Sequence, residues 1–179
     1  MLCSGRRTHD LTLLRVSVDY CKIEDQHIVL RPIFGSKTDS AQHQQSGWKL
    51  LCNPDNTLLC PVYWVKLLIN LSESRRDLAK ADNLFVTVTG RARPATRTII
   101  SGWVKKVLIE AGIKATPGSF RSAVASKRWV ENCQLDDILA KANWKSANTF
   151  TKFYRREIIP VSISSPSVRI ASNFVPVDV

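Results

Sequence analysis

The chain has 179 residues, a length typical of one domain. Hydrophobic residues make up 44% of the chain, which excludes a disordered protein. No apolar run approaches the ~20 residues that cross a bilayer, so we expect a soluble intracellular protein with no segment in a membrane. Lys and Arg total 26 against 15 Asp and Glu, and this net charge of +11 favours a polyanionic partner, nucleic acid or an acidic membrane surface.

The first third of the chain predicts a short helix followed by three strands. Residues 10–18 carry apolar side chains at a spacing that suits a helix. Residues 20–34 are rich in β-branched side chains and predict two strands joined by a turn at residues 24–26. A polar, turn-rich segment follows, and residues 48–52 predict a third strand. We therefore expect a small three-stranded antiparallel sheet near the N-terminus.

The middle of the chain predicts two helices with a basic loop between them. Pro61 suits the first helical position, and the apolar residues that follow predict a helix over residues 61–71. Residues 84–88 read as a short strand, which a Gly-Arg-Ala-Arg-Pro loop ends. Residues 98–111 are amphipathic and predict a helix that Gly112 caps.

Three short helices are predicted in the last third. Ser119 suits the N-cap of a helix over residues 120–132. Residues 135–142 begin with two Asp, which favour a helix N-terminus, and residues 147–156 form the third helix. From residue 158 the composition changes to Ser, Pro, Val and Ile, which indicates an arm or a disordered tail over residues 158–179.

Cysteine and histidine offer no metal-binding pattern. The five cysteines are an odd number without a CxxC pair, so we interpret them as free thiols. The three histidines are scattered and lack ligand spacing. Neither the phosphate-binding GxxxxGK[ST] nor the hydrolase motifs HExxH and GxSxG occur. The chemistry must therefore come from other residues.

Residues 117–157 hold an Arg, a Trp and a Tyr in a specific order. Arg121 opens one helix, Trp144 ends the next and Tyr154 lies on the third, with gaps of 23 and 10 residues. This block resembles the catalytic block of the tyrosine recombinases, the phage-integrase family. The gap of 10 is one residue longer than the commonest spacing and is similar to the eukaryotic retroelement subgroup. The resemblance implies a mainly helical α+β fold.

The N-terminal part resembles the same family. Gly5-Arg6-Arg7-Thr8-His9-Asp10-Leu11 is similar to the family's Gly-x-Arg-x-x-Glu/Asp-Leu, with Arg7 at the catalytic position. The family carries a Lys in a turn between two strands, and Lys37 is the candidate. The resemblance implies a catalytic domain over residues 1–157 and the absence of the N-terminal domain that clamps DNA, so we expect a fragment or a truncated product.

The resemblance implies DNA breaking and rejoining, in site-specific recombination or integration, without a metal or other cofactor. Tyr154 would form a 3′-phosphotyrosine, the guanidinium groups of Arg7 and Arg121 would stabilise the phosphoryl charge, Lys37 would protonate the leaving oxygen, and Trp144 would donate its indole N–H. Clusters of basic residues are candidate contacts to double-stranded DNA: Arg91, Arg93, Arg97, Lys127, Arg128 and Arg155.

Gly118 departs from the family, which has a His three residues before its second Arg. Two interpretations follow: a working recombinase, or a catalytically degenerate DNA-binding module of the same fold. A third is an interaction module unrelated to recombination, which a large separation of Arg7, Arg121 and Tyr154 would support. The family implies a DNA-bound homotetramer joined through a C-terminal arm, and the eukaryotic subgroup implies a nuclear location.

Overall fold

The computed structural model describes residues 4–144, 146–154 and 174–177. Three consecutive strands pair antiparallel: β1 (Cys21–Ile23), β2 (His27–Leu30) and β3 (Gly47–Leu51). The predicted three-stranded sheet is therefore confirmed. A fourth strand, β4 (Phe174–Val177), pairs antiparallel with β3 and extends the sheet from the far end of the chain. Pro176 suits this edge strand, because proline has no backbone N–H to donate and an edge strand has a neighbour on one side alone.

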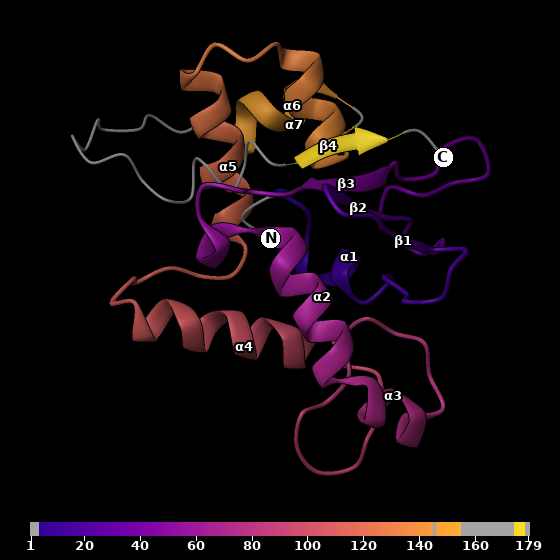
Figure 1. Cartoon of the computed structure of the whole chain (residues 1–179). Coiled ribbons are helices and arrows are strands. Elements are labelled where there is room, and N and C mark those ends of the chain that lie inside the picture. The colour runs from indigo at the N-terminus through magenta and orange to yellow at the C-terminus, as the bar shows by residue number, and fades with distance from the viewer. Residues whose placement is uncertain (1–3, 145, 155–173, 178–179) are drawn as a thin grey trace.

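The helices lie on two sides of the sheet (Figure 1). One group holds α2 (Pro61–Leu71), α3 (Glu73–Ala79) and α4 (Arg97–Glu110), and the other holds α5 (Ser119–Val130), α6 (Leu135–Ala142) and α7 (Ala147–Phe153). The short helix α1 (Thr8–Leu11) contacts α4, and the 3-10 turn η1 (Thr57–Leu59) precedes α2. The mixed α+β architecture agrees with the predicted fold class.

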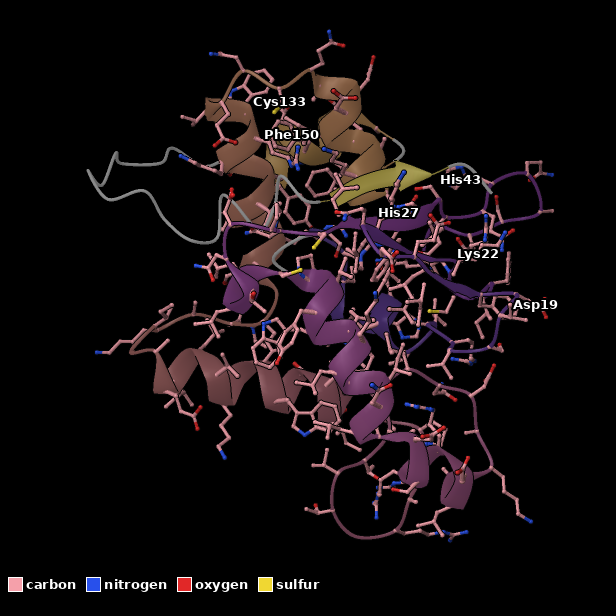
Figure 2. All side chains as sticks on the ribbon, in the orientation of Figure 1. Asp19, Lys22, His27, His43, Cys133 and Phe150 are labelled. Carbon is pink, nitrogen blue, oxygen red and sulfur yellow. The ribbon has the colours of Figure 1, made fainter. Side chains whose placement is uncertain are left out.

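Two separate apolar clusters form the core. The first packs one face of the sheet against α1, α2 and α4, with Ile28, Leu30 and Trp48 at its centre. The alternating burial of β2 explains this, because every second side chain faces the helices. The second cluster lies between α5, α6 and α7 and includes Ile138 and Phe150. In Figure 2, Phe150 and Cys133 lie in this helical group, away from His27 on the sheet.

Two predicted elements differ from the structure, and one observed helix has no predicted counterpart. The first helix ends at Leu11, because residues beyond it bond to a distant segment: Val16 N–H donates to Asp82 O and Leu14 O accepts from Leu84 N–H. The run over residues 84–88 forms one isolated bridge, Val86 to Pro94, and no regular strand. Helix α3 was not predicted. The predicted end of the last helix, residues 155–156, lies outside the described residues.

Candidate active site

The loop before α1 presents Arg7. Gly5 has a φ of +60°, which favours glycine, and a side chain there would contact Val124 of α5 at 3.5 Å. Arg7 caps α1, and its backbone N–H donates to Oδ2 of the buried Asp10 at 3.0 Å. The other Asp10 oxygen accepts from Ser36 Oγ at 3.1 Å. The Asp of the sequence motif therefore fixes the backbone that carries Arg7.

Arg121 lies in the first turn of α5 and bridges the two parts of the site. It is only 4% exposed. Its Nη2 donates to Ala142 O at 2.5 Å, and its Nη1 donates to Gly5 O at 3.4 Å, next to Arg7. Burial, followed by the positive charge of Arg7, lowers the pKa of Arg121 to about 10. The two guanidinium groups are thus close enough to repel each other, and an anion between them would relieve that repulsion.

Trp144 and Tyr154 stack beside Arg121. The Arg121 guanidinium lies 4.6 Å from the centre of the Trp144 ring and 5.6 Å from that of Tyr154. The two rings have centroids 4.4 Å apart and are tilted by 33°. Trp144 is buried against Phe150 as well. Tyr154 is half-buried, and its carbonyl accepts from Ser126 Oγ of α5 at 2.6 Å, which holds the end of α7 on α5.

The loop that carries Lys37 lies against both parts of the site. Ser36 directly precedes Lys37, and its hydroxyl donates to Asp10, the residue that fixes the backbone of Arg7. Thr38 directly follows Lys37, and its hydroxyl accepts from Asn143 Nδ2 at 2.5 Å. Asn143 directly precedes Trp144. Lys37 itself is exposed. Its backbone is therefore anchored at the site while its side chain remains free to turn toward a bound phosphate.

Three buried donors of the site point to a missing acceptor. Among the described residues, Arg7 Nη1, Arg121 Nε and Trp144 Nε1 are buried and lack a hydrogen-bond partner, as do Nε and Nη1 of the adjacent Arg6 and side-chain atoms of Gln45 and Trp48. Native proteins leave few buried polar groups unpaired, since each costs about 1–3 kcal/mol. A negatively charged ligand with several oxygens, such as a phosphodiester, would satisfy them. The arrangement is thus suited to binding a phosphate.

Arg6 supports the site, although no motif in the sequence marks it. It is fully buried, and its Nη2 donates to Ser46 Oγ at 2.8 Å and Ala140 O at 3.4 Å. Burial lowers the pKa of Arg6 to about 10. The residue thereby ties the sheet to α6 beside Arg7. No sequence signal distinguishes it, because the position between Gly5 and Arg7 is variable in the motif.

The predicted DNA contacts lie in different surroundings. Arg91, Arg93 and Arg97 are exposed, whereas Lys127 is half-buried with Nζ 3.8 Å from Glu131. Arg128 is 8% exposed, which leaves little of its side chain to reach a DNA backbone. Arg155 lies outside the described residues. Of the predicted contacts, Arg91, Arg93 and Arg97 are therefore the ones whose side chains are accessible to a DNA backbone.

Gly118 caps α5, three residues before Arg121, with φ −67° and ψ −24°. This conformation is open to any residue. A Cβ at this position would meet no atom closer than Thr116 Oγ1, at 3.7 Å. A histidine would therefore fit without displacing the backbone.

The fold of this chain is similar to that of a solved recombinase structure. The crystal structure of XerA recombinase has this fold, with a TM-score of 0.61 and 18% sequence identity over 94% of the present chain. The chain spans 51% of the XerA chain, about half its length. No family model and no curated protein matches the sequence. Within the described residues, no helix has the length and apolar character that a membrane span requires.

Proposed function

We propose that this chain is a catalytic domain that breaks and rejoins double-stranded DNA through a 3′-phosphotyrosine at Tyr154. The observation that carries the proposal is the convergence of Arg7, Arg121, Trp144 and Tyr154, from four separate segments, around buried donors without acceptors. The recombinase fold supports the same conclusion.

The reaction needs one nucleophile and stabilisation of one phosphoryl group. Tyr154 Oη releases its proton to solvent and attacks the scissile phosphorus, a P–O bond to Tyr154 forms, and the bond from phosphorus to the 5′ oxygen breaks. Arg7 and Arg121 donate to the phosphoryl oxygens as negative charge develops. Lys37 protonates the departing 5′ oxygen. Attack of a 5′ hydroxyl on the phosphotyrosine reverses these steps and rejoins the strand.

A covalent protein–DNA adduct tests this proposal directly. A duplex with a nick close to the cleavage position loses its short 5′-hydroxyl fragment after cleavage, so rejoining stops and the adduct accumulates. We expect a species that survives denaturation, disappears on digestion with protease and carries the nucleotide on Tyr154 by peptide mapping. Adduct mapped to another residue would contradict the assignment.

Gly118 favours a second candidate function, a DNA-binding module of the same fold without turnover. Because there is space for a side chain at Gly118, the histidine of the family can be introduced there, and its effect distinguishes the two functions. We expect Gly118→His to increase adduct formation by about a hundredfold, the lower end of the range for one general acid–base group. Gly118→Ala controls for the added Cβ and should leave the rate unchanged. If neither the parent nor Gly118→His forms adduct but both bind DNA, the binding module is the correct function.

A basic loop next to α4 supplies a surface for the DNA backbone. Arg75 of α3 organises this loop by donating to Thr87 O at 2.9 Å and Gly90 O at 2.9 Å, and Thr87 Oγ1 donates to Arg91 O. The exposed guanidinium groups of Arg91 and Arg93 are thus held on a loop of fixed shape. Such groups displace counterions from DNA when they bind it.

Arg93→Ala should reduce the dependence of DNA affinity on salt. The slope of log affinity against log salt concentration should fall by about 1, because one phosphate contact is lost. Lys22→Ala removes the same charge from the exposed side of β1, shown in Figure 2, and should leave the slope unchanged. Fluorescence anisotropy over a salt series measures both. Equal changes in the two variants would indicate a general charge effect in place of a local contact.

We also propose the finer features that the family resemblance implies: retroelement-type DNA integration, a homotetramer on DNA joined through the C-terminal arm, and a nuclear location. The gap of 10 residues between Trp144 and Tyr154 supports the subgroup. Light scattering of the chain with and without a duplex tests the assembly, since a monomer in both conditions contradicts it.

A further inference from the structure

We propose that Cys52 and Cys60 form an oxidisable dithiol that hydrogen peroxide converts to an intrachain disulfide. Cys52 directly follows β3, where its N–H donates to Gln26 O at 2.8 Å, and Cys60 caps α2. Their Sγ atoms are 3.5 Å apart. Because the two anchoring elements hold these sulfurs in contact, a shift of about 1.5 Å is enough to reach the 2.05 Å of a disulfide.

Cys60 is the better nucleophile of the pair. Its Sγ accepts from Asn53 N–H at 3.3 Å and Tyr63 N–H at 3.4 Å, at the N-terminus of α2. Burial opposes ionisation, but these hydrogen bonds and that from Cys52 outweigh it and lower the pKa of Cys60. The hydrogen bond to Cys60 and partial burial raise the pKa of Cys52. Cys60 is therefore the thiol of the pair that ionises more readily.

The oxidation balances with one peroxide molecule. The Cys60 thiolate attacks a peroxide oxygen, an S–O bond forms, the O–O bond breaks, and the hydroxide that leaves takes up a solvent proton. Cys52 then attacks the Cys60 sulfur, the S–S bond forms and the S–O bond breaks, and the second hydroxide takes the Cys52 proton. Two thiols are oxidised and peroxide is reduced to two waters. The half-buried Cys52 gives the sulfur pair a side open to this small oxidant.

The disulfide would link the two ends of a segment that lines an apolar cavity. The segment between the two cysteines carries Leu58 and Leu59, which line a cavity of about 470 Å³ between the sheet, α2 and α4. Trp64 Nε1 donates to Leu58 O at 2.9 Å and so couples this segment to α2. A disulfide sulfur is a weaker acceptor than a thiolate, so oxidation would also weaken the cap on Tyr63 N–H.

Peptide mapping of the peroxide-treated protein tests this inference, which is independent of the proposed function. We expect a Cys52–Cys60 crosslinked peptide, lighter than its reduced form by the mass of two hydrogens, which a dithiol reductant reverses. Cys52→Ser should instead leave a dimedone-reactive sulfenic acid on Cys60, because the resolving thiol is gone. Cys60→Ser should show neither product.

Cys133→Ser is the matched control, since Cys133 is a half-buried thiol of the helical group and far along the chain from the pair. This variant should form the crosslink at the parent rate. The proposal is overturned if peroxide oxidises Cys133 while both Cys52 and Cys60 stay reduced, or if the crosslinks formed join other cysteines. It is also overturned if Cys60→Ser leaves the oxidation of Cys52 as fast as in the parent.

Discussion

Tyr154→Phe should reduce formation of the covalent DNA adduct by at least about a thousandfold, because it removes the nucleophilic oxygen and nothing else. The Phe ring keeps the stacking on Trp144, whose centroid is 4.4 Å from that of Tyr154, and the backbone bond from Ser126 Oγ is unaffected. We therefore expect an unchanged melting temperature and DNA affinity within about twofold of the parent. A nicked duplex and denaturing electrophoresis measure the adduct, and anisotropy measures binding.

Tyr63→Phe is the matched control for this experiment. Tyr63 is 43% exposed on α2 and packs edge-on against Trp64, in the helical group on the other side of the sheet. Its variant should form adduct at the parent rate. If Tyr154→Phe retained the parent rate as well, the nucleophile would have to be another residue. The conclusions about the fold and the DNA-binding surface would still hold.

Local chemistry explains which elements the sequence predicts well. Helix α2 begins at Pro61 and ends at Leu71 as predicted, because proline suits the first turn and lacks an N–H that would need a partner. Helix α6 also has its predicted bounds, with Asp136 and Asp137 at its N-terminus. The prediction of a helix beyond Leu11 was wrong. The apolar residues of this run enter the core, while their backbone groups hydrogen-bond to the segment near Leu84. Such long-range pairing has no local signature.

In the candidate site, too, the local motifs could be predicted from the sequence and the long-range contacts could not. The order and spacing of Arg7, Arg121, Trp144 and Tyr154 were visible in the sequence, since each occupies a motif position. Their mutual contacts depend on how α5 packs against the loop at Gly5, which only the three-dimensional structure reveals. The buried Arg6 was invisible for a similar reason. Its partners, Ser46 and Ala140, are 40 and 134 residues away.

Arg121→Lys should reduce adduct formation by about a hundredfold to a thousandfold, the cost of one lost oxyanion donor in comparable sites. Lysine keeps the charge but lacks the planar fork, so it cannot donate to Ala142 O, Gly5 O and a phosphate together. The variant should also lose about 1–3 kcal/mol of folding stability, because one or both carbonyls lose a partner. Thermal unfolding quantifies this loss, and adduct rates are then compared at a temperature where both proteins are folded.

Arg76→Lys separates the chemical effect from the structural one. Arg76 of α3 is as buried as Arg121 and also donates to a backbone carbonyl, that of Ile69, but it lies in the helical group opposite α5. Its variant should lose comparable stability and keep the parent adduct rate. If the two variants lost stability and rate in parallel, Arg121 would act only by supporting the fold. Loss of rate in Arg121→Lys alone would instead place its guanidinium on the reacting phosphate.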